Sequence, residues 1–407
     1  MSKNINVPKL RFKEFSGEWE EKKFEDIFSF SIGKNIKQNE ASPDYETPCV
    51  RYGELYHMYN EVILKVINKT NLDKSELLFS DGDEILMPSA GEDPLDIGLA
   101  SALTLKNVAI GRTINILKPL KQNIYSQIFV SYYINSKLRK KISTLAKGSS
   151  ISNVYNSDLK QLKAKLPTLE EQEKIAIFLN SVDEKIEKLT KKDELLQQYK
   201  KSIMQKIFSQ EIIFKDDKGK EFPEWEIISL KSIFKERKQM VTKSKNYEHI
   251  SLTVEGVVAK TERYERDFLV SDDSIKKYKV TKLNDICYNP ANLKFGVIAR
   301  NKYKDGIFSP IYVTFEVINA NISFIEYLVT RRDFINSVRK YEEGTVYERQ
   351  AVKAEDFLRF SIKLPQIEEQ NKIANFLSSI DDKIEENQKI LKKSKEFKKS
   401  LLQQMFV

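Results

Sequence analysis

The sequence is poor in the residues that usually carry metal sites and catalytic chemistry. Among its 407 residues are two cysteines, Cys49 and Cys287, and two histidines, His57 and His249. Two cysteines make neither a disulfide framework nor a zinc pattern, so a reducing, cytosolic setting is the default expectation. Each histidine stands alone, and we expect both to be surface or packing residues rather than metal ligands.

Other chemical patterns are also missing. The 13 glycines form no Walker loop and no Gly-x-Gly-x-x-Gly pattern. Asn289-Pro-Ala-Asn292 partly resembles the Asn/Asp-Pro-Pro-aromatic motif of amino-methyltransferases, but it lacks the second proline and the aromatic residue, so we expect a turn. Asp183-Glu-Lys and Asp382-Lys are expected to be surface charges on helices. With no nucleophile–base pair and no metal cluster, we do not expect catalysis by this chain.

Long apolar runs are absent too. No stretch approaches the roughly 18 apolar residues of a membrane span. Residues 1–8 lack the apolar run of a signal peptide. A cytoplasmic protein with no membrane partner is therefore expected.

The chain does contain one stretch twice. Leu166–Phe208 and Leu364–Phe406 align without a gap at a constant offset of 198, and 21 of the 43 positions are identical. Chance does not produce such a match, so the chain carries an internal duplication. Both copies open with Leu-Pro-x-x-Glu-Glu-Gln-x-Lys-Ile-Ala and then contain neither Gly nor Pro. This predicts unbroken helices over 168–208 and 366–406, and Thr168 with Glu171 predicts a capping box on the first.

Apolar residues of both copies are spaced as in a coiled coil. The predicted seam comprises Ile175, Leu179, Val182 and Ile186 in the first copy and Ile373, Leu377, Ile380 and Ile384 in the second. It is expected to continue through Leu196, Tyr199, Ile203 and Ile207 and through Leu391, Leu401 and Met405. Neither helix, roughly 60 Å long, can bury this seam alone, so we expect the two to pack on each other, in either orientation. Two unrelated amphipathic helices, each on its own domain, are the alternative.

The rest of the chain forms two segments of similar plan. In the first, turn residues separate apolar runs that predict strands at 49–52, 61–67, 83–87, 97–100 and 113–117, before a helix over 127–144. In the second, Phe295–Arg300 corresponds to Ile97–Ser101, and a helix opening at Asn321 corresponds to one opening at Asn123. The pattern predicts an α+β fold. The expected domains are 1–165, 166–208 (first helix), 209–363 and 364–407 (second helix).

The net charge of +9 is concentrated outside the duplicated helices. No acidic residue lies between Asp96 and Asp158, whereas nine lysines and arginines do, and Lys147-Gly-Ser-Ser-Ile-Ser-Asn153 ends this stretch. Cations suit phosphates, and short polar side chains suit base edges. The stretch therefore indicates a polyanion-binding face, with a solvated basic face that binds nothing as the alternative.

The duplicated motif and the segments around it resemble, over the full chain, the specificity (HsdS) subunit of type I restriction–modification systems. The resemblance implies two globular α/β target-recognition domains on an antiparallel pair of long helices with approximate two-fold symmetry. Each domain would read one half of a bipartite, asymmetric site in double-stranded DNA. Two modification subunits would dock on the helices and methylate adenine N6, and restriction subunits would add translocation and cleavage. No cofactor is expected in this chain; S-adenosylmethionine, ATP and Mg²⁺ are expected in the partner subunits.

Candidate DNA-binding residues follow from position in the basic stretches and loops. They are Arg112, Lys147, Ser149, Ser150 and Asn153 in the first half and Arg300, Arg339, Thr345, Tyr347, Arg349 and Gln350 in the second. The helix pair is expected to act as a ruler, so that four inserted residues, about 6 Å of helix, lengthen the gap by about one or two base pairs. Two rivals remain: a non-catalytic coiled-coil adaptor joining two protein-binding domains, and a catalytic nuclease or methyltransferase.

Overall fold

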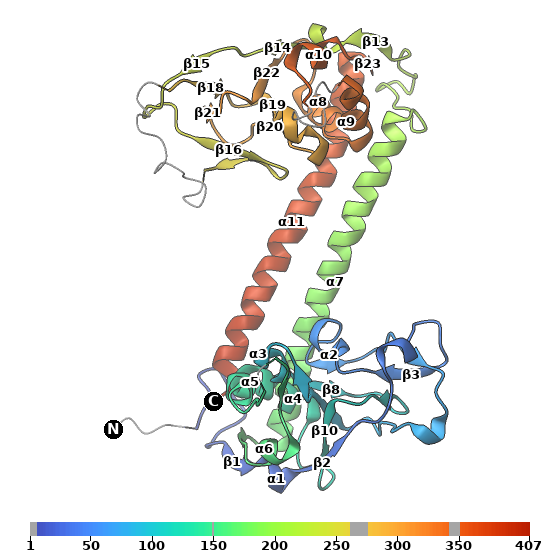
Figure 1. Ribbon diagram of the computed structural model, residues 1–407, viewed down its shortest axis with the longest axis vertical. Helices are drawn as coiled ribbons and strands as arrows, with labels where there is room; N and C mark the ends of the chain where they lie inside the picture. The colour runs from blue at the N-terminus through green and yellow to red at the C-terminus, as the bar shows by residue number, and fades with distance from the viewer. Residues whose placement is uncertain (1–5, 149, 261–275, 342–350) are drawn as a thin grey trace. The chain divides into compact units, whose positions relative to one another are not determined.

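The computed structural model of the chain describes residues 6–148, 150–260, 276–341 and 351–407. The chain folds into two compact units: unit 1 is Met1–Lys192 with Asn387–Val407, and unit 2 is Asp193–Glu386. Two long helices, α7 (Leu169–Phe208) and α11 (Ile367–Met405), are unbroken, and each contributes one part to each unit (Figure 1). None of the helices in these ranges has the length and hydrophobicity that crossing a membrane requires.

Unit 1 holds a five-stranded sheet in the order β2-β10-β6-β8-β4, smaller strand pairs and short helices (Figure 1). Its strands are β1 Glu20–Lys23, β2 Phe28–Ile32, β3 Thr47–Val50, β4 Val62–Ile63, β5 Lys69–Thr70, β6 Glu84–Pro88, β7 Ala90–Gly91, β8 Ser101–Leu103, β9 Ala109–Ile110, β10 Ile114–Pro119, β11 Ser152–Asn153 and β12 Lys163–Leu166. Its helices besides α7 and α11 are α1 Phe24–Ile27, α2 Glu54–His57, α3 Pro94–Ile97, α4 Gln127–Tyr133, the π-helical turn η3 Ile134–Leu138, α5 Arg139–Ser143 and α6 Asn156–Lys160, with 3-10 turns η1 Gln38–Glu40 and η2 Lys74–Glu76.

Unit 2 repeats the central part of this plan with the sheet order β14-β22-β19-β20. Its strands are β13 Glu226–Ser229, β14 Phe234–Glu236, β15 Met240–Val241, β16 Ile250–Thr253, β17 Gly256–Ala259, β18 Tyr278–Thr281, β19 Ile286–Tyr288, β20 Ile298–Arg300, β21 Gly306–Phe308, β22 Val313–Val317 and β23 Ser361–Leu364. Its helices are α8 Ile322–Val329, α9 Arg332–Val338 and α10 Ala354–Arg359, with 3-10 turns η4 Leu230–Ser232, η7 Pro290–Phe295 and η8 Arg339–Tyr341. Mixed α and β units joined by long helices confirm the predicted fold class.

The structure corrects three expected elements of the first segment. Residues 97–100 are not a strand: Pro94–Ile97 forms α3, because Asp93 accepts a hydrogen bond from the Leu95 N–H and proline suits the first helical position. The strand expected at 61–67 is limited to Val62–Ile63, the two residues that pair with β8. Helix α4 begins after its cap Ser126, not at Asn123, so Ser126 is the equivalent of Asn321, which caps α8.

The repeated Glu-Glu-Gln sequence anchors the globular segment of each unit to a long helix. The Gln172 side chain accepts from the Ser126 N–H at 3.0 Å and donates to the Pro167 carbonyl at 2.9 Å. Gln370 makes the same two bonds, with the Asn321 N–H at 2.9 Å and the Pro365 carbonyl at 2.8 Å. A single glutamine thus satisfies two backbone groups at each junction, which explains its presence in both copies.

The glutamate before each of these glutamines also has a side-chain partner in its own unit. Thr168 caps the Glu171 N–H at 3.4 Å, but the expected reciprocal bond of a capping box is absent, because the Glu171 carboxylate pairs with Arg11 at 2.7 Å instead. Glu369 accepts from the Trp225 indole N–H at 3.1 Å. Burial raises the pKa of Glu369, and the indole N–H partly offsets this.

The seam of each long helix lies in the core of both units. Ile175, Leu179 and Val182 pack with Leu401, Met405 and Phe406 in unit 1, and Ile373, Leu377, Ile380 and Ile384 pack with Ile207 in unit 2; Ile186 is partly buried. In unit 1 the Asn387 amide donates to the Leu189 carbonyl and Lys398 pairs with Asp183. Residue numbers rise along α11 as they fall along α7, so the helices run antiparallel there. Tyr199 is 48% exposed and does not belong to the seam, because Lys200 takes the inward position.

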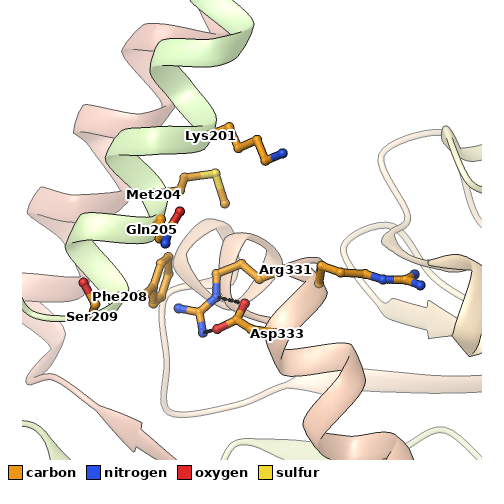
Figure 2. Close-up of a pocket in the computed structure, with 8 residues that line it drawn as sticks. Lys201, Met204, Gln205, Phe208, Ser209, Arg331 and Asp333 are labelled. Atoms are coloured by element: carbon orange, nitrogen blue, oxygen red, sulfur yellow. Dashed lines mark hydrogen bonds and ion pairs between the residues drawn. The ribbon is translucent and has the colours of Figure 1, made fainter.

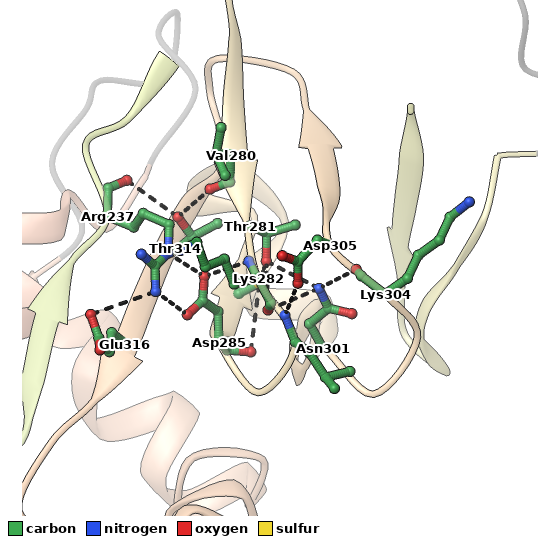
Figure 3. A network of polar contacts seen from close by, with 12 residues as sticks. Arg237, Val280, Thr281, Lys282, Asp285, Asn301, Lys304, Asp305, Thr314 and Glu316 are labelled. Carbon is green, nitrogen blue, oxygen red and sulfur yellow. Dashed lines mark hydrogen bonds and ion pairs between the residues drawn. The ribbon is translucent and has the colours of Figure 1, made fainter. Parts of the chain in front are cut away.

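Equivalent strands of the two units begin at a buried carboxylate whose cation comes from a different strand. Glu84 accepts from the backbone N–H groups of residues 81–83 and pairs with Lys118 on β10 at 3.0 Å. Asp285 accepts from the Lys282 N–H and pairs with Arg237, which follows β14, at 2.7 Å (Figure 3). The hydrogen bonds to Asp285 raise the pKa of the Arg237 guanidinium. The buried carboxylate is therefore common to the two units, whereas the residue that neutralises it comes from a different strand in each unit.

The seam predicts a position-dependent cost of truncation. Leu179→Ala should destabilise the chain by about 2–5 kcal/mol, because the side chain is fully buried. The matched control Ile177→Ala, two residues away and 73% exposed, should change stability by less than about 0.5 kcal/mol. Urea unfolding followed by circular dichroism measures both, and equal effects would contradict the assigned seam.

Candidate nucleic-acid interface

One end of the central sheet in unit 1 gathers four loop segments. Strands β2 and β6 end there and β10 begins there, because β10 pairs with both in the antiparallel sense. The Ser89 N–H donates to the Thr113 carbonyl and the Val154 N–H to the Ser89 carbonyl, each at 2.9 Å. The Asn156 amide donates to the Ser31 carbonyl at 3.0 Å. We call residues 31–36, 89–91, 111–113 and 150–156 the unit 1 edge.

Backbone strain is concentrated at this edge. Gly33 is buried against Gly111, and a Cβ added to Gly33 would overlap the Gly111 carbonyl. Asn35, Ile36 and Thr113 have φ values of 49°, 55° and 67°. Positive φ is costly for β-branched residues such as Ile36 and Thr113, and such strain tends to occur where the backbone has a functional role.

The segments of Gly33 and Gly111 cross in close contact, and we call this contact the strained crossing. Arg112 follows Gly111 and lies at the surface. The Arg112 N–H donates to the Asn35 carbonyl at 2.9 Å, which holds the backbone of the arginine against the neighbouring segment. Its side chain is exposed and has no polar partner within the described part of the chain. Lys34 is exposed two residues from the strained Ile36. A fixed backbone with an uncommitted guanidinium is suited to bidentate recognition of a phosphate or a guanine edge.

The predicted Gly-Ser-Ser loop joins the same edge. Lys147 and Asn153 exchange two backbone hydrogen bonds at 2.9 and 2.8 Å, and β11 pairs with β7 at Ala90–Gly91. Lys147 is partly neutralised by Asp158 at 2.9 Å. Ser150 is exposed and Asn153 is half-buried. The structure therefore brings Arg112, Ser150 and Asn153 to one edge with Lys147 beside it, whereas Ser149 lies outside the described residues.

The candidate DNA-binding residues of unit 2 have different surroundings from those of unit 1. Arg300 is bound to the Asn284 side chain at 2.6 and 2.9 Å and to the Ser323 hydroxyl at 3.0 Å, and it lies 3.6 Å from Glu326. These contacts hold the guanidinium inside its own unit. Arg339 opens η8. The remaining candidates, Thr345, Tyr347, Arg349 and Gln350, lie outside the described residues.

The equivalent sheet end of unit 2 presents different chemistry. Asn289 accepts from the N–H groups of Ala291 and Asn292, so Asn289-Pro-Ala-Asn292 is a capped turn, as the sequence predicted. It leads to Phe295, which is 64% exposed with the Lys294 ammonium 5.1 Å from its ring centroid. An exposed aromatic ring beside a cation is suited to stacking on a base rather than to pairing with a phosphate.

Unit 2 also contains a cavity of about 480 Å³ at the end of α7. It is lined by Lys201, Met204, Gln205, Phe208, Ser209, Arg331, Arg332 and Asp333 (Figure 2). The Arg331 guanidinium stacks on Phe208 at 4.1 Å and pairs with Asp333 at 2.6 Å. Burial lowers the pKa of Arg331, and Asp333 opposes this effect. The equivalent aromatic of unit 1, Phe406, is buried against Trp19, Phe129 and Tyr133.

One cluster of carboxylates has a spacing that could hold a metal ion. Asp81, Asp83 and Glu84 bring ligand atoms within 4.8 Å of one another. The Lys118 ammonium lies 2.6 Å from Asp81 and 3.0 Å from Glu84, and backbone N–H groups occupy Glu84 further. Burial and the neighbouring Glu84 raise the pKa of Asp83. The cluster is therefore a neutralised structural network at the start of β6.

Sequence inspection missed the segment that holds the backbone of Arg112. Asn35, whose carbonyl accepts from the Arg112 N–H, lies far from it in the sequence and meets it only because β2 and β10 are paired. Two Gly-basic dipeptides, Gly33-Lys34 and Gly111-Arg112, each adjoin a strand and were the available sequence indication.

Comparisons with known proteins agree with this architecture. The S subunit of a type I restriction–modification system from M. genitalium superimposes with a TM-score of 0.63 at 17% identity, covering 98% of this chain and 99% of that one. The two units on long helices thus define the fold of a type I specificity subunit.

Sequence relatives extend the comparison. The MjaVIII specificity subunit of Methanocaldococcus jannaschii is 24% identical over 96% of this chain and 94% of its own length. The putative MjaX specificity subunit of the same organism is 25% identical over 98% and 95%. The model of the type I restriction modification DNA specificity domain matches residues 16–197 and 223–394, so the chain belongs to this family. The resemblance inferred from the duplicated motif is confirmed, and the chain is a non-catalytic specificity subunit.

The close contact between the backbones of Gly33 and Gly111 can be tested by adding one methyl group at Gly33. Gly33→Ala should destabilise the chain by roughly 1–3 kcal/mol, because the added Cβ has no space beside the Gly111 carbonyl. The control Gly53→Ala should be neutral or slightly stabilising, because Gly53 has φ −64° and open space around its Cβ position. Thermal unfolding of both variants measures this, and a neutral Gly33→Ala would contradict the packed crossing.

Proposed function

We propose that each unit of this specificity subunit reads one half of a bipartite, asymmetric DNA site. The single observation that carries the proposal is the unit 1 edge, where a strained crossing fixes the backbone of Arg112 while its guanidinium stays uncommitted. Lys147 and other exposed cations would contact phosphates and set the register, and Arg112, Ser150 and Asn153 would face base edges. In unit 2 Phe295 would do the equivalent work, together with the sequence-based candidates Thr345, Tyr347, Arg349 and Gln350.

The difference between the units supports two different half-sites. The central sheets share their strand order, yet the edge of unit 1 carries an exposed arginine and that of unit 2 an exposed phenylalanine. Bidentate contacts of arginine select guanine, whereas stacking tolerates any base. Shared architecture with divergent edge chemistry is what two readers of unequal sequences require.

We propose further that two modification subunits dock on the long helices. Several residues are identical in both copies although they are exposed and lie outside the apolar seam: Lys185 and Lys383, Lys201 and Lys399, Gln205 and Gln403. Equal surfaces on equivalent helix positions suit two copies of one partner. Those partners would supply S-adenosylmethionine and adenine-N6 methylation, restriction subunits would bring ATP and Mg²⁺, and this chain would hold no cofactor. The helix pair would set the gap between the half-sites.

The decisive experiment maps N6-methyladenine in DNA from cells that express this chain with its modification subunit. One bipartite motif, with a methylated adenine in each half, is the expected result. A steep fall in DNA affinity of the complex with rising salt is expected as well, because phosphate contacts release counterions. Salt-independent binding without sequence preference would favour the protein-binding adaptor, and S-adenosylmethionine binding by the isolated chain would favour the methyltransferase.

A substitution at the edge of unit 1 should relax one half-site only. Arg112→Ala should lose about 1–3 kcal/mol of discrimination at one base pair, so that the mapped motif becomes degenerate there while the other half is unchanged. The control Lys121→Ala removes an exposed cation beyond the opposite end of β10 and should leave the motif intact. An unchanged motif in Arg112→Ala would show that this arginine does not read DNA.

A further inference from the structure

Three side chains meet in unit 2 from three separate segments of the chain. The Lys200 ammonium on α7 lies 2.5 Å from the Asp381 carboxylate on α11. The Tyr327 hydroxyl on α8 donates to the same carboxylate at 2.7 Å, and Lys200 lies 5.2 Å from the centroid of the Tyr327 ring. The Ser378 hydroxyl is also within hydrogen-bonding distance of Tyr327, at 3.3 Å. One recognition helix is thereby tied to both long helices.

Unit 1 contains the same three residue types in the same roles. Lys398 on α11 pairs with Asp183 on α7 at 2.7 Å, so the sequence-based view of Asp183 as surface charge is wrong. The Tyr132 hydroxyl on α4 donates to Asp183, and Lys398 lies 5.5 Å from the Tyr132 ring centroid. Glu61 adds a second carboxylate at 2.9 Å from Lys398. Burial alone would lower the pKa of Lys398, but Glu61 and Asp183 outweigh it and hold the pKa above its usual value.

The two triads are related by the internal duplication. Asp183 and Asp381, like Lys200 and Lys398, are separated by the repeat offset of 198. Each triad therefore takes its aspartate from one helix copy and its lysine from the other. A coiled-coil seam of aliphatic residues allows alternative registers, and a polar contact at one fixed position removes them. Because the lysine of one copy can meet the aspartate of the other only in one antiparallel alignment, a shift by one heptad would break the triad.

We propose that the Lys–Asp–Tyr triads are positioning clamps: each fixes the recognition segment of its unit on α7 and α11 in one register, and so helps to set the gap between the DNA half-sites. The effect on the gap rests on the proposed function. The positioning of α4 and α8 on the long helices does not depend on DNA binding. Tyrosine makes the contact specific to the recognition segment, because its hydroxyl reaches the aspartate while its ring covers the lysine.

The unit 2 clamp is the one to test, because among the described residues Asp381 is the carboxylate that pairs with Lys200, without a counterpart of Glu61. We would prepare Lys200→Asp, Asp381→Lys, the charge-swapped double variant of these two, and Tyr327→Phe, each in the full chain with its modification subunit. Lys188→Met is the control, because Lys188 pairs with Glu184 on the exposed side of the same helix. Hydrogen exchange of α8 amides is the first readout, since it needs no DNA. The length of the gap in the methylated motif is the second.

The single charge variants should exchange their α8 amides about tenfold faster than the parent, and the swapped pair should recover most of this loss. Methylation in the single variants should extend to sites with a gap altered by about one base pair, and the swap should restore the parental gap. Tyr327→Phe should loosen α8 without unfolding α7 or α11. The control should match the parent in both readouts.

Two results would overturn the clamp. Unchanged α8 exchange in folded single variants would show that the triad does not hold the recognition helix. Loosened α8 with an unaltered gap would show that the triad holds the helix without setting the spacing. If the parent complex itself produces no bipartite motif, the proposed function fails, and the exchange data still decide whether the triad positions α8.

Discussion

The structure depends on the fact that neither long helix can bury its apolar seam alone. In unit 1 the first part of α7 packs with the last part of α11, and in unit 2 the last part of α7 packs with the first part of α11. Each globular segment then completes its core on this two-helix surface, through Trp19 and Phe129 in unit 1 and Phe324 and Phe357 in unit 2. The apolar seam and the globular segment thus share one hydrophobic core in each unit.

Some polar contacts are made by the same residue types in both units, and others are made by residues from different positions in the fold. The glutamines that satisfy backbone groups and the Lys–Asp–Tyr triads are the same in both units. The cations that neutralise Glu84 and Asp285 come from different strands. A contact that joins separate segments restricts both partners, whereas a buried carboxylate requires only some nearby cation. The contacts that join separate segments are therefore alike in the two units, whereas the cations that neutralise the buried carboxylates differ.

The two units carry different side chains where their central sheets end. The same edge of the fold offers an exposed arginine on a strained crossing in unit 1 and a phenylalanine beside a lysine in unit 2. Loops at sheet ends can change without disturbing the core, because their side chains face solvent and their backbones are held by the strands. A scaffold that repeats while its loops differ is consistent with the proposal that the two units read different DNA sequences.

The sequence by itself determined the duplication, the two long helices, the mixed α and β segments and the family, because these depend on periodicity and on identity at a fixed offset. Tertiary structure decided which charged and polar side chains are free to contact a ligand and which are bound within the fold. It showed Arg300 bound to Asn284 and Ser323, Asp183 drawn into an ion pair and Tyr199 turned outward in favour of Lys200. It also brought the Asn35 carbonyl to the Arg112 N–H. Periodicity reports which face of an element is apolar, but whether a charged side chain is free depends on partners supplied by distant segments, and only the folded chain brings those together.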